Sequence, residues 1–286
     1  MMFFGDWAPC LLRCDSSLPG ACALVNLEGP LLPRNHALPP APKAGPSLYS
    51  TGPPRTDGRL MCSLANNHLM DYGAEGLTTT LHALHLRGAL GAGAGLTRAA
   101  ARQPLFIVEQ GVRIAVIACC EAQFGTAQLD RPGVAAVGPW VQGAIAESRA
   151  QADAVVVSVH AGAELAPWPA PAMQDLYRSW IDAGATVIHG HHPHVPQGFE
   201  AYRGGLILYG LGNLAVDPAA WQAHPNAHWS LAVEVDFAVN PLQWRVHQMA
   251  IIRDGERIAL TPVDPGLHAA YREDCNRPLA DRGLLE

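Results

Sequence analysis

Several short apolar runs in this sequence each end in a polar side chain that can bind a metal ion or carry a proton. Residues 154–159 form a nearly continuous β-branched run, which is typical of a strand buried on both faces, and His160 follows directly. The runs that end at Asp6, Glu28 and His192 repeat this order. Such strands must be buried in a sheet, and their polar ends are expected to gather at one edge of it.

The repetition of this order is a stronger signal than any one member of it. An acidic residue at the end of a strand is often only a helix cap or a solvated turn residue. Independent polar loops would not be expected to repeat the placement so often. The strand-end residues are Asp6, Glu28, Asn67, His68, His160, His192 and His194.

Four of the thirteen histidines lie within six residues, at His189, His191, His192 and His194. For a single histidine a solvated polar loop would be the better interpretation, but the cluster favours a metal or catalytic site because neutral imidazole is the commonest protein ligand of transition metals. Together with carboxylates and an amide, it suits one or two divalent transition-metal ions (Mn, Zn or Fe) better than calcium. Two ions about 3.5–4 Å apart, sharing a carboxylate, could activate water and hold a phosphoryl group.

The composition is that of a compact globular protein, with 49% hydrophobic and 15% charged residues. The net charge of −6 excludes a general attraction to nucleic acid or to acidic membranes. The 286 residues contain no evident linker and no internal repeat. We expect one domain over residues 1–286, with a core over about 1–260 and a C-terminal tail over 261–286.

Strand and helix patterns alternate early in the chain, and strands dominate late. Helices are expected at 71–88, 139–150 and 170–183, and a β-hairpin at 104–118. Further strands are expected at 205–211 and 229–237, with 242–253 and 256–260 as candidates to extend the same sheet. This order predicts an α/β fold in which two mixed β-sheets are flanked by helices. In the first helical segment the residues expected on or near one face are Leu77, Leu81, Leu84 and Leu86.

Three segments rich in glycine or proline are expected to be connections. Residues 31–59 predict a long surface loop, which is long enough to cover a site at the strand ends. Residues 91–95 alternate glycine with alanine but lack the lysine of a phosphate loop, so they predict a close-packed turn. The stretch after the histidine cluster is expected to be a loop that ends at Gly198.

The seven cysteines favour a reduced, cytoplasmic protein. Several of them lie in apolar runs, where cysteine behaves as a small hydrophobic residue, and Cys10 and Cys14 have no second close pair to complete a zinc ribbon. No signal peptide and no apolar run of membrane-spanning length is recognisable. We therefore expect a soluble, cytoplasmic protein with no membrane segment in this chain.

At these residues the sequence resembles a known bacterial family. The segments GDW, NLEGPL, LANNHLMDYGAEGL, VHAGAE, GHHPHVPQGFE and LYGLGN, from Asp6 to about Asp217, resemble those of the CapA-type capsule and poly-γ-glutamate synthesis proteins. That family is a branch of the calcineurin-like metallophosphoesterases. The resemblance implies their fold, a sandwich of two mixed β-sheets flanked by helices.

The resemblance also implies roles for the strand-end residues. Asp6 and His194 correspond to ligands of a first metal ion, and Glu28 stands at the position of the carboxylate that bridges two ions. His68 corresponds to the histidine that acts on the phosphate or the leaving group. The remaining implied ligands, all of the second ion, are Asn67, His160 and His192.

One position departs from the wider superfamily pattern. Phosphoesterases of this kind usually carry a histidine two residues after the first aspartate, and Ala8 occupies that place here. Asp71, Glu164 and Asn213 resemble recurrent polar positions of the family that orient imidazoles by hydrogen bonding. Helix capping is an equal alternative for Asp71, as is a loop-fixing role for Asn213. His189 and His191 are expected only to flank the site.

The function favoured by these features is that of a metal-dependent hydrolase, a phosphoesterase that uses a metal-activated water while His68 assists the leaving oxygen. The alternative is a role in the synthesis of poly-γ-glutamate or a capsule polymer, through amide bonds or without hydrolysis. A third hypothesis, a scaffold that has lost its chemistry, is disfavoured because only position 8 is altered. The expected partner is a small-molecule phosphate ester or a polyglutamate-type substrate.

Overall fold

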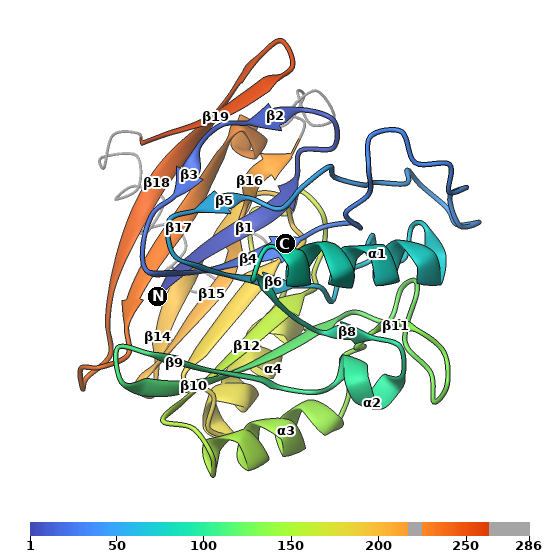
Figure 1. The fold of residues 1–286 in the computed structure, drawn as a ribbon. Coiled ribbons are helices and arrows are strands. Elements are labelled where there is room, and N and C mark those ends of the chain that lie inside the picture. The colour runs from blue at the N-terminus through green and yellow to red at the C-terminus, as the bar shows by residue number, and fades with distance from the viewer. Residues whose placement is uncertain (217–224, 263–286) are drawn as a thin grey trace, which may run out of the picture.

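Two β-sheets pack face to face in the computed structural model, which describes residues 1–216 and 225–262 (Figure 1). The first sheet has the order β2-β19-β18-β17-β1-β4-β6-β7, and β16 pairs with β1 at its end. The adjacent strands β1, β4, β6 and β7 are parallel, whereas β17, β18 and β19 form an antiparallel extension. Their bounds are β1 Met2–Ala8, β2 Arg13–Cys14, β4 Cys22–Leu27, β6 Arg59–Ser63, β7 Leu90–Ala92, β16 Asn213–Val216, β17 Trp229–Asp236, β18 Gln243–Asp254 and β19 Arg257–Pro262.

The second sheet has the order β14-β15-β13-β12-β10-β9. Its four central strands are parallel, and the two outer strands pair antiparallel with their neighbours. The bounds are β9 Leu105–Glu109, β10 Val112–Cys120, β12 Ala154–His160, β13 Val187–His191, β14 Pro196–Tyr202 and β15 Gly205–Leu211. The predicted α/β sandwich of two mixed sheets, which the metallophosphoesterase resemblance also implies, is confirmed.

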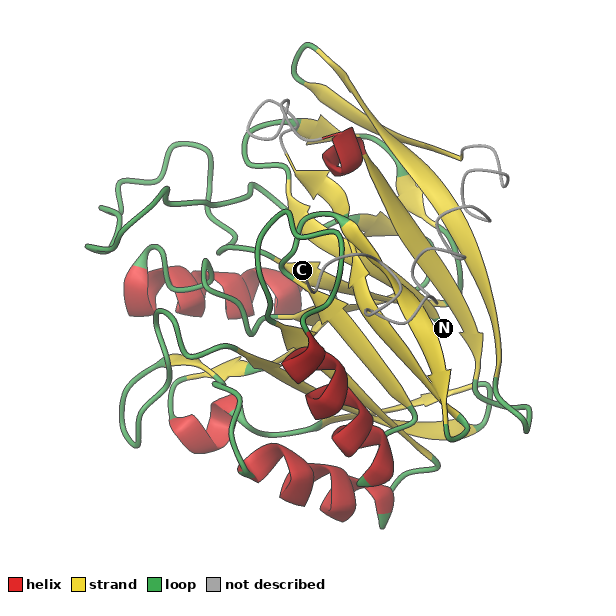
Figure 2. Cartoon of the chain, turned by 180° about the vertical axis from the view of Figure 1, so that it is seen from behind, coloured by secondary structure: helices red, strands yellow, loops and turns green. Residues whose placement is uncertain are grey.

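Three apolar layers hold the sheets and helices together. Between the sheets, side chains such as Phe3 and Leu24 meet Val156 and Leu208 from the other sheet. Helices pack against the outer faces, and Figure 2 shows them from behind. The helices are α1 Gly73–Leu86 over the first sheet, α3 Trp140–Arg149 and α4 Pro171–Asp182 over the second, and the short α2 Arg98–Ala101.

Short elements complete the described chain. They are β3 Ser17–Leu18, β5 Arg55–Thr56, β8 Ala94–Gly95, β11 Gly133–Val134 and the 3-10 helix η2 Pro225–His228. The predicted hairpin and the second and third predicted helices are confirmed as β9–β10, α3 and α4. The predicted tail, 261–286, lies outside the described residues from position 263 onward.

Several local predictions were wrong. Leu86 is 69% exposed because it lies nine residues after the buried Leu77 in α1, which places it on the opposite face of the helix. The stretch that was expected to be a loop ending at Gly198 is instead β14, which forms because it pairs with β15. The glycine run contains β7 and β8, although its close packing is real: a Cβ atom at Gly93 would lie 2.7 Å from the side chain of Ala118.

The middle of the long connection between β4 and β6 contacts the segment that follows β6. The connection is mostly irregular and exposed, as predicted, but the backbone N–H of Ala41 donates to the carbonyl oxygen of Asp71 at 2.7 Å. The backbone N–H of Leu48 donates to the Asp71 carboxylate at 2.6 Å. These contacts anchor the middle of the connection beside the segment that follows β6.

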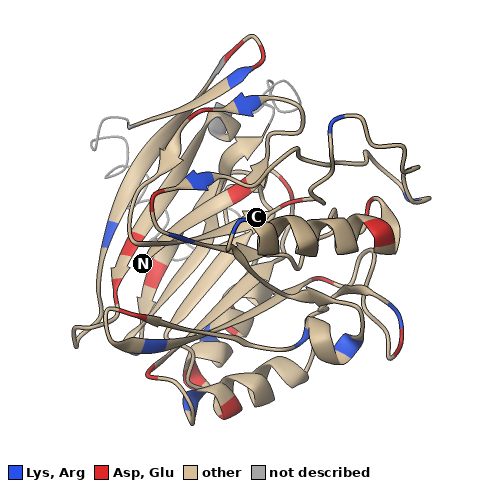
Figure 3. Ribbon diagram, viewed as in Figure 1, with Lys and Arg blue, Asp and Glu red and all other residues tan. Residues whose placement is uncertain are grey.

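Charged side chains are sparse on the described elements. In Figure 3 the two signs are interspersed over the ribbon, in keeping with the low content of charged residues in the sequence. Among the described residues, none of the helices is both long enough and apolar enough to cross a membrane.

Candidate metal centre

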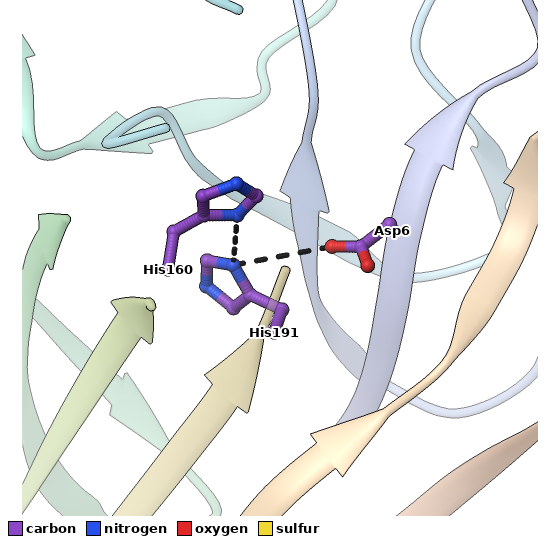
Figure 4. Close-up of side chains that lie close together, drawn as sticks. All are labelled: Asp6, His160 and His191. Atoms are coloured by element: carbon purple, nitrogen blue, oxygen red, sulfur yellow. Dashed lines mark hydrogen bonds and ion pairs between the residues drawn. The ribbon is translucent and has the colours of Figure 1, made fainter. Parts of the chain in front are cut away.

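Strands from both sheets bring their carboxyl ends to one place. In the first sheet, Asp6 of β1 stands opposite Asn26 of β4, and in the second sheet His160 of β12 stands opposite His191 of β13. Figure 4 shows Asp6 facing the two imidazoles across the gap between the sheets. The predicted gathering of polar strand ends is therefore present in the structure.

Four overlapping sets of side chains there could hold a metal ion, because in each set the candidate ligand atoms lie within 4.8 Å of one another. Glu28 belongs to two of the sets. Three of the sets each combine one aspartate or glutamate with two buried imidazoles. The sets are Asp6–Glu28–His194, Glu28–His160–His192, Asp6–His160–His191 and Glu164–His192–His194. Glu164 is exposed, so it stands at the rim of the cluster, whereas the other members are buried.

The carboxylate of Glu28 carries the clearest mark of a cation site. It is fully buried, and neither of its oxygens has a hydrogen-bond partner among the described residues. Its nearest polar neighbours are Nε2 of His194 at 3.5 Å and Nε2 of His160 at 3.7 Å. Burial raises the pKa of Glu28 to about 8, with a smaller contribution from Asp6, while His194 acts in the opposite direction. A divalent ion would satisfy these oxygens, so the residues fit a metal.

Asp6 is held by its neighbours and by a close approach of two backbone segments. The side-chain N–H of Asn26 donates to Oδ1 of Asp6 at 2.8 Å, and the backbone N–H of Asp6 donates to the carbonyl oxygen of Gly212 at 3.0 Å. A Cβ atom at Gly5 would lie 1.7 Å from that same carbonyl oxygen, so only glycine fits there. Burial raises the pKa of Asp6, which an adjacent cation would oppose.

The segment from His192 to His194 has a strained backbone. The φ angles of these two histidines are 105° and 60°, in the region that side chains other than glycine rarely adopt. Nδ1 of His194 lies 2.8 Å from Oδ1 of Asn213, which turns Nε2 toward Glu28. Burial lowers the pKa of His194, but Glu28 and Asp6 outweigh this and raise it overall. Of the two roles considered for Asn213, this contact fits the orientation of an imidazole.

Two other histidines of the cluster are held in the neutral form that binds metals. Burial, reinforced by the neighbouring imidazoles, lowers the pKa of His160 far below its usual value. Burial also lowers the pKa of His192 to about 4. Nε2 of His160 lies 3.0 Å from Oδ1 of Asn67, which is half-buried at the mouth of the cluster.

His68 lies beside this cluster and belongs to a separate group of contacts. Its Nδ1 is 2.7 Å from Oδ2 of Asp71 and 3.0 Å from Nζ of Lys43. Lys43 also forms an ion pair with Asp71, and only 7% of its side chain is exposed. Asp71 is therefore not a helix cap: Tyr72 precedes α1, and the carboxylate of Asp71 instead fixes His68, Lys43 and the long connection.

Sequence reasoning missed three residues that the structure brings to the site: Asn26, Lys43 and His191. One feature of the sequence could have drawn attention to Lys43. It is the only lysine in the sequence, and the other permanently charged basic residues are all arginines. His191 was expected only to flank the site, but its Nδ1 lies 3.9 Å from Oδ1 of Asp6 and 2.8 Å from Nδ1 of His160 (Figure 4).

Comparison with known proteins gives related sequences. The chain is 35% identical over 167 residues to the capsule biosynthesis protein CapA of Bacillus anthracis, covering 56% of this chain and 41% of that protein. It is 34% identical over 237 residues to a Mycobacterium tuberculosis protein named as a probable polyglutamine synthesis accessory protein, covering 74% of this chain and 59% of the relative. The chain thus spans about two-fifths to three-fifths of the length of these relatives.

Solved structures are more distant. The chain is similar to a hypothetical protein from Thermus thermophilus, with 15% identity, a TM-score of 0.41, and coverage of 92% of this chain and 97% of the other. It is also similar to a novel phosphatase from Mycoplasma pneumoniae, with 12% identity, a TM-score of 0.48, and coverage of 87% and 92%.

A family match covers most of the chain. Residues 4–218 match the family described as bacterial capsule synthesis protein PGA_cap. This range includes both sheets up to β16 and every strand-end residue of the cluster. The chain therefore belongs to the PGA_cap family of bacterial capsule synthesis proteins.

Proposed function

We propose that this protein is a metal-dependent hydrolase that cleaves phosphate esters. The observation that carries the proposal is the buried Glu28 carboxylate, which lacks hydrogen-bond donors among the described residues and is surrounded by imidazoles. A buried carboxylate without donors is costly unless a cation compensates it. The cluster therefore supports a metal-binding function over a purely structural one.

The chain offers ligands for one or two ions of Mn, Zn or Fe. Asp6, Glu28 and His194 would hold the first ion. Glu28 would also contact the second, whose other ligands would be Asn67, His160 and His192. Such ions, when bound, lower the pKa of a water molecule and withdraw charge from a phosphoryl oxygen. Ala8 offers no ligand, so the first ion has fewer imidazoles than in related phosphoesterases.

His68 is the residue placed to move a proton. The Asp71 carboxylate can only accept, so the 2.7 Å contact requires a proton on Nδ1 of His68, and a second proton carried on Nε2 could be donated to the leaving oxygen of a substrate. The imidazole of His68 lies near the cluster. Burial is the main cause of the lowered pKa values of His160 and His192, and His68 adds a small lowering effect on both. The roles assigned by sequence resemblance fit this geometry.

The relatives' names support a second candidate function. They refer to capsule biosynthesis and to polyglutamine synthesis, so the same cluster could act on a polyglutamate-type polymer, through its amide bonds or without hydrolysis. The two candidates differ in substrate. The cytoplasmic location expected from the sequence stays a prediction, and protease accessibility in intact cells would test it.

The first experiment compares substrates in protein reconstituted with Mn, Zn or Fe. Release of phosphate from a panel of phosphate esters is measured beside chain shortening of poly-γ-glutamate. We expect phosphate release, and a fall in turnover of about 10²–10⁴-fold in His68→Ala with the metal content unchanged. His82→Ala, on the exposed face of α1, is the matched control. Equal phosphate release by His68→Ala and the parent protein would refute the assigned role.

A further inference from the structure

A line of buried polar contacts runs from the backbone of β1 to the metal cluster. Nε2 of His189 lies 2.8 Å from the carbonyl oxygen of Phe4, and Nδ1 of His189 lies 3.0 Å from Oγ of Ser158. The same Oγ lies 3.0 Å from Nε2 of His191, whose Nδ1 lies 2.8 Å from Nδ1 of His160. The three imidazoles and the serine are at most 2% exposed.

The direction of each hydrogen bond follows from the fixed end of this line. A carbonyl oxygen can only accept, so His189 must carry its proton on Nε2. In a neutral ring Nδ1 is then an acceptor, and the single proton of Ser158 must point to it. The oxygen of Ser158 can then only accept from His191, which must carry its proton on Nε2 and expose a lone pair at Nδ1.

The last link determines the tautomer of His160. Two bare nitrogens would repel each other at 2.8 Å, so the proton between them must belong to Nδ1 of His160. Nδ2 of Asn26 also lies 3.2 Å from this nitrogen; one of its two N–H groups donates to Asp6 at 2.8 Å, and a protonated Nδ1 of His160 cannot accept the other. Nε2 of His160 is therefore a lone pair, and it faces the oxygen of Asn67 at 3.0 Å. In the metal-free protein the Asn67 amide can turn and donate an N–H to this lone pair, and in the metal-loaded protein the lone pair is available to the ion.

We propose that Ser158, His189 and His191 form a relay that fixes His160 in the one tautomer able to bind the second metal ion. They are positioning residues: they act through His160 and need not touch the ion. The proposal concerns the metal site of the proposed function, but it depends on cation binding and not on the substrate. It also gives His191 a function different from that of a ligand replacing the imidazole absent at Ala8.

Histidine NMR of the metal-free protein tests the relay without any substitution. With ¹⁵N-labelled histidine, long-range ¹H–¹⁵N correlations report which ring nitrogen carries the proton. We expect the proton on Nε2 in His189 and His191 and on Nδ1 in His160. A proton on Nε2 of His160, donated to Asn67, would overturn the proposal.

A serine substitution tests the consequence for metal binding. Ser158→Ala removes the middle of the relay, and we expect Mn²⁺ to bind about 10–100-fold more weakly by titration calorimetry, the usual cost of losing a group that orients a ligand. Ser63→Ala is the matched control: Ser63 is an equally buried strand serine whose hydroxyl has no hydrogen-bond partner in the described part of the chain. It should bind Mn²⁺ like the parent protein. Equal affinities in the two variants would refute the relay.

These readouts separate the relay from the phosphoesterase proposal. Neither measurement uses turnover, so the relay stands or fails whether or not a phosphate ester is cleaved. Conversely, a protein that cleaves phosphate esters but shows the opposite tautomer of His160 would keep the proposed function and lose the relay. If Ser158→Ala does not fold, the tautomers of the unaltered protein still decide the question.

Discussion

The two walls of the metal cluster are built in different ways. One wall, formed by His160 and His191, belongs to adjacent parallel strands whose register fixes the backbone on both sides. The other, formed by His68 and Lys43, lies outside regular strands and depends on side-chain contacts to Asp71. We call them the strand wall and the loop wall. The difference suggests that the rigid wall fixes the orientation of a metal ligand, His160, and that the groups that meet a varying substrate sit on the adjustable one.

The largest effect is expected where the two ion sites meet, at Glu28. Glu28→Gln should remove the bound metal and reduce turnover to background, as measured by elemental analysis and phosphate release. If the variant still bound two ions per chain, a carboxylate shared between the sites would be excluded. The two ions would then bind independently of each other.

The same substitution should stabilise the metal-free protein at alkaline pH. The pKa of Glu28 is raised to about 8, so the folded state holds this proton more tightly than the unfolded state does. Its contribution to stability is complete below the unfolded pKa and is lost as the pH rises toward about 8. In urea titrations at about pH 9, we expect the free energy of unfolding of Glu28→Gln to exceed that of the parent by roughly 2–4 kcal/mol. At about pH 4 the two free energies should differ little.

A smaller effect is expected from the loop wall. Lys43→Met leaves one oxygen of Asp71 without its cation and loosens the long connection, so we expect about tenfold lower turnover with unchanged metal content. Lys43→Arg should restore part of the activity. Arg34→Met, an exposed position of the same connection, is the control. Loss of metal from Lys43→Met would show that the loop wall also holds the ions.

The smallest effect concerns the loss of stability at acid pH that protonation of His192 causes. His192 directly follows β13, the strand that carries His191 of the strand wall. Burial lowers the pKa of His192 to about 4, so its contribution to stability is present above the unfolded pKa and is lost as the pH falls toward 4. Urea unfolding of the metal-free protein should therefore become easier between about pH 6.5 and about pH 4. His192→Ala should make this dependence less steep by about one proton. His82→Ala should leave it unchanged, and an unaltered slope in His192→Ala would contradict the prediction.

The sequence predicts the strand-end residues better than it predicts the position of Lys43. Asp6, Glu28 and His160 follow apolar runs directly, so the position of each at a strand end can be inferred from neighbouring residues alone. Lys43 lies in a segment without periodicity, and its place depends on contacts with Asp71 that only the folded chain creates. Lys43 is the only lysine in the sequence, but this fact of composition gives no information about where the residue lies in the fold.

Two further differences have the same physical origin. Asp71 stands before a helix, where local rules favour a cap, but tertiary hydrogen bonds from Leu48 and His68 engage its carboxylate instead. The strand β14 contains proline and glycine and has no clear alternation, and it becomes a strand by pairing with β15. In both cases partners distant in sequence outweigh local preference.

The position of β1 has a consequence for how the protein matures. Asp6 is synthesised long before Asn213, with which it pairs in register, and β1 also pairs with β17, which is synthesised later still. The site of Asp6, His194 and Asn213 cannot close until most of the chain has emerged. Nascent or prematurely terminated chains would therefore lack a complete metal site. Metal binding should occur late, after most of the chain has been synthesised and folded.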